Sequence, residues 1–215
     1  MSSVKTRKLD ISTILAVVKA QTGPPEIQTA VLRETTAFGV PSTITFATEI
    51  DNIRVSRNIN DIQYNTLGIT VEAPNFTIPG SGTFEISARA NFTATWQVIT
   101  TSGNWGVVRS RLYLRNETDN LDSVLIGDNC FGEQIQIDVN NRALPCQGVA
   151  PLTGVFTQTK TTTYSLQQIC NTQFQNVRIM GYPQLYPAKT GGSPISTSST
   201  DPEYYANVKI TKIAS

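Results

Sequence analysis

The sequence contains no histidine, and this absence excludes several kinds of catalytic and metal site. Ser–His–Asp and Cys–His catalysis need an imidazole base, and histidine-containing metal sites need an imidazole ligand. The phosphate-binding pattern GxxxxGK[ST], a GxGxxG turn and a CxxC pair are also absent. Carboxylates remain, but no two of them are marked as the acid and base of a glycoside hydrolase. We therefore expect no enzymatic activity, no catalytic residues, no cofactor and no metal.

Charge and long apolar runs are also scarce. Only 15% of the residues are charged and the net charge is +1, so the chain has no basic footprint for nucleic acid. No window of about 18 consecutive apolar residues could form a transmembrane helix. The apolar run at 14–18 is short for a signal peptide. We expect the folded domain to bind no nucleic acid and to have no membrane span.

The chain has three cysteines, Cys130, Cys146 and Cys170, which is an odd number. Buried or half-buried free thiols are the favoured interpretation. One disulfide, for instance between Cys130 and Cys146, stays open because connectivity cannot be chosen from spacing.

Threonine is the most abundant polar residue, with 29 copies, and threonine favours β-strands. The clearest strand is 83–98, where every even position is apolar and every odd position is polar. Because side chains on a strand alternate between two faces, this stretch predicts one buried and one solvated face. A turn at 79–82 precedes it, and a bend or bulge is expected near Ala88 and Ala90. The residues expected on the buried face include Phe84, Ile86, Phe92 and Trp96.

Shorter strands are expected along the rest of the chain, with turns between them. The strands are expected at 29–35, 42–50, 67–73 continuing to 78, 108–115, 133–139, 155–170, 174–180 and 203–213. A hairpin turn is expected at 101–104, a polar loop at 116–129 and long connections at 140–154 and 183–202. This pattern predicts an all-β fold, an antiparallel β-sandwich or jelly roll of about 8–10 strands.

Residues 1–28 are interpreted as an N-terminal arm, and 29–215 as a single jelly-roll domain. Ile11, Ile14, Leu15 and Val18 have the spacing of a short helix. The Gly23-Pro24-Pro25 sequence would then end it. Two interpretations stay open: an arm that docks on neighbouring subunits, and a frayed terminus.

Two groups of side chains are candidate sites. Asp119, Asp122 and Asp128 lie close together in the sequence and carry oxygen ligands that suit Ca²⁺, but without DxDxDG spacing, so a solvated loop is favoured. On strand 108–115, Val108, Ser110, Leu112 and Leu114 are expected to face inward. The outward positions are Arg109, Arg111, Tyr113 and Arg115. They could form a ligand surface, although a solvated or interface face is favoured.

The stretches 76–87 (FTIPGSGTFEIS) and 110–116 (SRLYLRN) resemble the jelly roll of complement globular heads and tumour necrosis factor-like domains. Residues 126–128 and the aromatic strand 204–210 extend the likeness, which implies a trimeric head. The chain lacks a collagen-like stalk and has longer connections than that family. Single jelly rolls of this size also resemble viral vertex (penton) and minor capsid proteins, whose terminal arms tie subunits together.

The favoured function is therefore a self-assembling structural protein of a virion. Copies would form a trimer or pentamer beside neighbouring capsid proteins, burying sheet edges and faces between them. The alternative is an extracellular trimeric head that binds a receptor or glycan.

Overall fold

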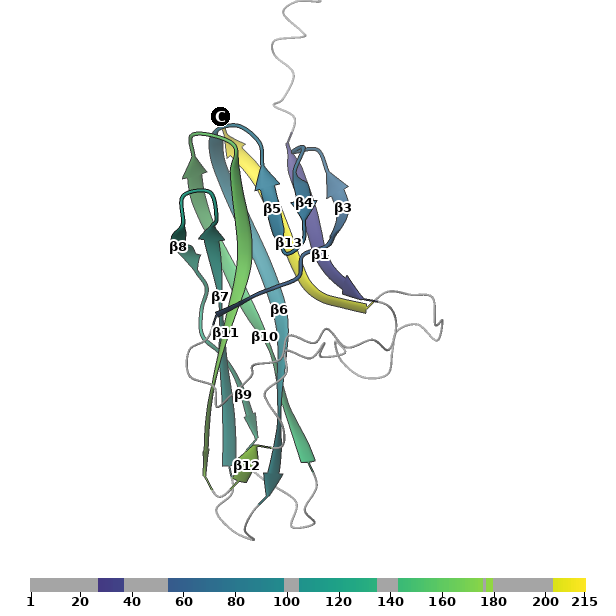
Figure 1. Cartoon of the computed structure of the whole chain (residues 1–215), viewed down its shortest axis with the longest axis vertical. Helices are drawn as coiled ribbons and strands as arrows, with labels where there is room; N and C mark the ends of the chain where they lie inside the picture. The colour runs from purple at the N-terminus through teal and green to yellow at the C-terminus, as the bar shows by residue number, and fades with distance from the viewer. Residues whose placement is uncertain (1–26, 37–53, 99–104, 135–142, 176, 180–202) are drawn as a thin grey trace, which may run out of the picture.

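The computed structural model describes residues 27–36, 54–98, 105–134, 143–175, 177–179 and 203–215. These residues form thirteen strands and no helix, in two antiparallel sheets packed face to face (Figure 1). The expected all-β sandwich is confirmed. Among the described segments, no helix is long and apolar enough to cross a membrane. The arm at 1–26 and the expected strand at 42–50 lie outside the described residues, as does the 183–202 connection.

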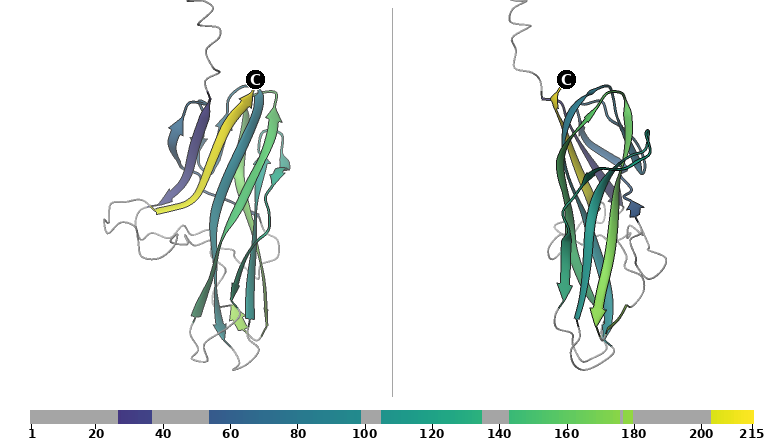
Figure 2. Two further views of the ribbon diagram at one scale, coloured as in Figure 1. Left: turned by 180° about the vertical axis from the view of Figure 1, so that it is seen from behind. Right: turned by 90° about the vertical axis from the view of Figure 1, so that its left-hand side faces the viewer.

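The chain passes repeatedly from one sheet to the other, as in a jelly roll (Figures 1 and 2). Among the described strands, the chain passes to the other sheet at eight of the connections between successive strands. The six-stranded sheet has the order β10 (Ala143–Gln158), β6 (Gly82–Val98), β13 (Glu203–Ala214), β1 (Thr29–Thr36) and β3 (Asp61–Asn65), with β12 (Val177–Ile179) also on β6. The seven-stranded sheet has the order β4 (Thr70–Glu72), β5 (Asn75–Ile78), β11 (Thr162–Gln175), β7 (Trp105–Asn116) and β8 (Leu121–Ile126), with β2 (Arg54–Ser56) on β11 and β9 (Cys130–Gln134) on β7.

Strand β6 lies between β10 and β13 in the six-stranded sheet. Its even-numbered side chains from Phe84 to Phe92 are buried, which confirms the expected alternation; the side chain of Trp96 is outside the described set. No bulge occurs near Ala88 and Ala90, because pairing with β10 continues from Gly82 to Gln97 without a register shift, and the alternative of a bend stays a prediction. One odd position departs from the pattern, since Asn91 is buried.

A series of contacting aromatic rings packs between the two sheets, beside the start of β6. Phe84 stacks on Phe156 with ring centroids 5.6 Å apart, and Phe156 meets Tyr164 edge-on at 5.2 Å. Phe76 lies 6.1 Å from Tyr164 on the other side. Of the residues expected to face inward on β7, Ser110, Leu112 and Leu114 are buried. The side chain of Val108 is outside the described set.

The turn before β6 is fastened to the core by Gln158 at the end of β10. The Gln158 amide donates to the carbonyls of Ile78 and Gly80 at 3.0 and 2.7 Å, while its Oε1 accepts the Tyr164 hydroxyl at 3.0 Å. Gly82 has φ of 152°, and a Cβ there would lie 2.8 Å from the Ala214 carbonyl. The turn expected at 79–82 therefore depends on glycine for both conformation and space.

Threonine side chains pair across adjacent strands. Hydroxyl oxygens of Thr77 and Thr163 lie 2.8 Å apart, and the Thr83–Thr157 and Thr29–Thr211 pairs follow at 3.2 and 3.3 Å. Each pair is directly opposed in the strand register. Such cross-strand hydroxyl pairs stabilise a sheet, which gives a structural use for the threonine-rich composition.

Strand β10 forms one outer edge of the six-stranded sheet. Its unbroken register with β6 includes Pro145 and Pro151, which have no amide hydrogen to donate. Both prolines therefore occupy positions whose amide nitrogen faces away from β6. Gly127, after β8, approaches this edge so closely that a Cβ would lie 2.2 Å from the Pro151 carbonyl.

Several predicted connections are wrong. The 116–129 segment contains strand β8, and the expected connection at 140–154 contains most of β10. The strands that flank 101–104 belong to different sheets, so this segment does not join a hairpin. Strands β2 and β3 were not expected, and the predicted strand at 67–73 is reduced to β4. Of the 133–139 strand, only the start is described, as the end of β9, while 174–180 is divided between β11 and β12.

Candidate functional site

The outer face of β7 presents the candidate ligand surface. Leu112 and Leu114 point into the core, so the alternate positions Arg109, Arg111 and Arg115 lie on the outer face. Arg109 is exposed, and Arg111 and Arg115 are half-buried. The predicted orientation of this strand is therefore confirmed.

Aromatic rings support two of the arginines on this face. The Arg54 guanidinium carbon lies 3.9 Å from the ring centroid of Tyr113, and the Arg109 guanidinium carbon lies 5.4 Å from that of Phe131. Guanidinium groups are attracted to aromatic faces at these distances. Arg54 comes from β2, two strands away from β7. Sequence reasoning missed it, because β2 was not expected, and it did not predict that Tyr113 would be buried.

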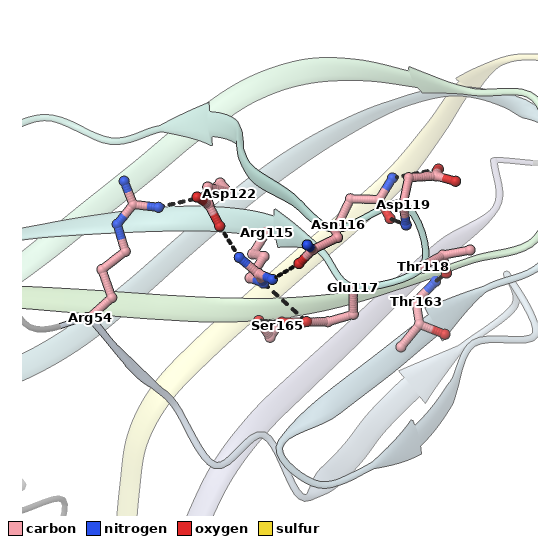
Figure 3. A network of polar contacts seen from close by, with 10 residues as sticks. Arg54, Arg115, Asn116, Glu117, Thr118, Asp119, Asp122, Thr163 and Ser165 are labelled. Atoms are coloured by element: carbon pink, nitrogen blue, oxygen red, sulfur yellow. Dashed lines mark hydrogen bonds and ion pairs between the residues drawn. The ribbon is translucent and has the colours of Figure 1, made fainter.

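Acidic side chains from the turn between β7 and β8 and from β8 itself neutralise the charge of Arg115 (Figure 3). Its Nε lies 3.0 Å from a Glu117 oxygen, and its terminal nitrogens contact Asp122 and Asn120. Glu117 also accepts a hydrogen bond from the Ser165 hydroxyl at 2.5 Å. The positive charge of Arg115 is therefore already matched by two carboxylates.

Asp119 is tied to the same turn by other partners. Its backbone amide donates to Asn116 Oδ1 at 2.9 Å, and its carboxylate accepts from Asn116 Nδ2 at 3.1 Å and from Lys160 Nζ at 2.6 Å. The hydrogen bonds from Lys160 and then Asn116 lower the pKa of Asp119 below its ordinary value. Beside it, the Thr118 hydroxyl accepts the Thr163 amide at 2.9 Å. The turn is thus fixed to β11.

These contacts bear on the calcium interpretation of the 116–129 segment. Asp119 forms an ion pair with Lys160 and Asp122 forms one with Arg115, so the two carboxylates bind different basic side chains. Asp128 is exposed between β8 and β9. Within the described residues, no three carboxylate or cysteine side chains are grouped as metal ligands. The favoured loop interpretation needs correction too, since part of the segment is strand.

A second polar cluster, which the sequence analysis missed, lies inside the sandwich. The side chains of Glu34 on β1 and Arg57 after β2 are both 0% exposed, and their ion pair is 2.6 Å long. Arg57 Nη1 contacts Gln168 Oε1 at 3.3 Å, Gln168 Nε2 donates to Ser110 at 2.7 Å, and Ser110 donates to the Ile169 carbonyl at 3.0 Å. Glu34 lies at an alternate position of β1 in line with Ala30 and Leu32, which are buried. This alternation was the sequence signal that could have predicted the burial of Glu34.

This buried chain of contacts joins the sheets and has no access to solvent. Glu34 belongs to the six-stranded sheet, while Gln168 and Ser110 belong to the seven-stranded one. Because a substrate could not reach it, we assign the cluster to structure and not to chemistry.

Cys130 is a free, half-buried thiol whose side chain packs against the core. This state of Cys130 agrees with the free-thiol interpretation. The side chains of Cys146 and Cys170 are outside the described set.

No protein-family model matches the chain. No curated protein matches it either. Among solved structures, the crystal structure of murine APRIL at pH 5.0 is similar over 87% of this chain and 100% of that chain. The sequence identity is 10% and the TM-score is 0.32. A likeness at this level assigns no ligand, partner or activity.

Proposed function

We propose that this chain is a non-enzymatic, self-assembling jelly-roll protein that serves as a structural subunit of a virion. The observation that carries the proposal is that exposed apolar side chains lie along both edges of the six-stranded sheet, on its outer face. Val149 and Val155 on β10 are 40% and 53% exposed, and Tyr64 on β3 is 52% exposed. Burial of such side chains between copies would release apolar surface from water.

The surroundings of these side chains suit an interface between subunits. Ser87, Thr153 and Asn207 are exposed on the same face and carry uncharged hydrogen-bonding groups. Interfaces between subunits commonly contain such hydrogen-bonding groups beside buried apolar side chains. Because the net charge of the chain is only +1, long-range electrostatic forces between copies are weak, and association should depend mainly on buried area and only weakly on salt.

The experiment is to measure the mass of the purified full chain by light scattering and to image it by negative-stain electron microscopy. We expect closed oligomers or particles. Val155→Glu should shift the mass towards the monomer, because the new charge would be buried without a partner. Thr70→Glu, an exposed change on the other sheet, is the matched control and should assemble normally. A chain that stays monomeric over the accessible concentration range would contradict the proposal.

The second candidate is an extracellular trimeric head that binds a receptor or glycan. The arginines on the outer face of the seven-stranded sheet favour a recognition surface. A stable trimer without larger particles would support this candidate over a virion subunit.

A further inference from the structure

We infer that the outer face of the seven-stranded sheet holds a binding site for an anionic sugar, centred on Arg54 and Arg111. Both residues are paired with Ile169 of β11, Arg54 from β2 and Arg111 from β7. Residues paired in this way share one face of a sheet, so the three side chains form a row across the strands. Adjacent strands lie about 4.8 Å apart, which places the two arginine backbones roughly 10 Å from each other.

The positive charges of this row are not matched by carboxylates in the described part of the chain. Arg111 makes no ion pair there, and its Nε is buried without a hydrogen-bond partner. Arg54 contacts the Tyr113 ring and donates to the backbone carbonyl of Asp122 at 2.6 Å, and neither partner carries a negative charge. Arg115, in contrast, is paired with two carboxylates. An anion bound between Arg54 and Arg111 would supply the missing countercharge.

The site is already organised for binding. The stacking on Tyr113 and the bond to Asp122 hold the Arg54 guanidinium in place, so less conformational entropy is lost when a ligand binds. The next row across the same strands contains Ser56 and Gln167, both half-buried. Their hydroxyl and amide groups are suitable hydrogen-bond partners for sugar hydroxyls.

The number of unmatched charges favours a sugar over a nucleic acid. Nucleic-acid-binding proteins commonly contact about 6–10 phosphates, whereas this row offers two arginines. Single-stranded nucleic acids also need exposed aromatic faces for base stacking, and the Tyr113 ring is covered by Arg54. An acidic peptide would need an apolar anchor pocket, but the row contains only Ile169 between its arginines. A carboxylated or sulfated sugar needs one or two cations and several neutral polar groups, which is the composition of this row.

The test is binding of the full chain to immobilised 3′-sialyllactose, 3′-sulfolactose, lactose and an oligothymidylate, each displayed in many copies because single sugars bind weakly. We expect retention on an acidic sugar and not on lactose, and the two acidic probes distinguish carboxylate from sulfate. Arg111→Gln and Arg54→Gln should each weaken binding about tenfold or more, the loss of one charge-assisted hydrogen bond. Arg89→Gln makes the same charge change on the exposed outer face of the other sheet and should bind normally.

Unfolding midpoints of all variants show whether a loss of binding comes from a loss of fold. Arg111→Lys keeps the charge but not the planar group, and should recover part of the affinity. Equal binding to lactose, equal loss in Arg89→Gln, or tighter binding to the oligothymidylate would each overturn the inference. The inference does not depend on self-assembly, because a monomer that binds the acidic sugar would contradict only the proposed function.

Discussion

The guanidinium of Arg57 lies 2.6 Å from the carboxylate of Glu34, and both side chains are completely buried between the two sheets. Transfer of two charges into a protein interior costs several kcal/mol each, and only a close pair with further hydrogen bonds offsets this cost. Arg57 has such bonds through Gln168, and its backbone amide donates to the Leu166 carbonyl at 2.7 Å. The pair therefore fixes the segment after β2 to both sheets.

Removal of one partner of this pair should be strongly destabilising. Glu34→Gln leaves the Arg57 charge buried without a countercharge, and we expect a loss of about 3–5 kcal/mol in the free energy of unfolding. The double variant Glu34→Leu with Arg57→Met removes both charges and should recover most of that loss. Urea denaturation followed by circular dichroism measures both values. A single variant within about 0.5 kcal/mol of the parent would show that the pair is not formed in solution.

Truncation of Phe92 tests the buried face of β6. The side chain is fully buried, so Phe92→Ala should cost about 3–5 kcal/mol of unfolding free energy. Ser87→Ala, on the solvated face of the same strand, is the control and should change stability by less than about 0.5 kcal/mol. An unchanged unfolding midpoint for Phe92→Ala would contradict the assigned core.

The close approach of Gly127 to β10 should not tolerate a side chain. A Cβ at Gly127 would overlap the Pro151 carbonyl, so Gly127→Ala must displace backbone and should cost at least about 2–3 kcal/mol. Gly80→Ala is the comparison, because a Cβ at Gly80 meets nothing within 4 Å and only its φ of 70° is unfavourable. The measurement is the thermal unfolding midpoint of each variant. If the Gly127 contact were loose, Gly127→Ala would have a higher unfolding midpoint than Gly80→Ala, which would contradict the prediction.

Tyr164 should make stability depend on pH in the alkaline range. Burial raises the pKa of Tyr164 to about 12, whereas an unfolded tyrosine ionises near pH 10. The folded state therefore keeps its proton while the unfolded state loses it, so stability is complete below about pH 10 and falls as the pH rises towards about 12. Unfolding free energies across this range, compared with those of Tyr164→Phe, measure the effect. Equal pH slopes for the two proteins would exclude Tyr164 as the cause.

The N-terminal arm stays a prediction, and deletion of residues 1–24 tests it. The Gly23-Pro24-Pro25 break separates the arm from β1, so the truncated chain should keep a β-type circular dichroism spectrum. If the arm docks on neighbouring subunits, the deletion should also reduce the oligomer mass. Loss of the folded spectrum would instead place the arm in the core.

The alternation of apolar and polar residues was sufficient to predict β6, β7 and β13, and the inward faces of β6 and β7. Long strands with one buried face carry this signal because burial acts on every second residue. The same rule failed for β8, whose residues are mostly exposed or half-buried, and for β10, whose prolines and glycines suggested a connection. Outward arginines of β7 were predicted, but Arg54 and the buried Arg57 were not. Those two depend on long-range pairing with β11, which a local pattern does not report.

The prolines of β10 affect how copies of the chain can associate through this edge. A free strand edge with regular amide donors can template the addition of further strands and lead to fibrils. Pro145 and Pro151 remove two donors from this edge, and the backbone at Gly127 covers the carbonyl of Pro151. Addition of a strand from another copy along β10 is therefore disfavoured. Under the proposed function, an assembly would grow through contacts between finished domains, as a closed shell requires.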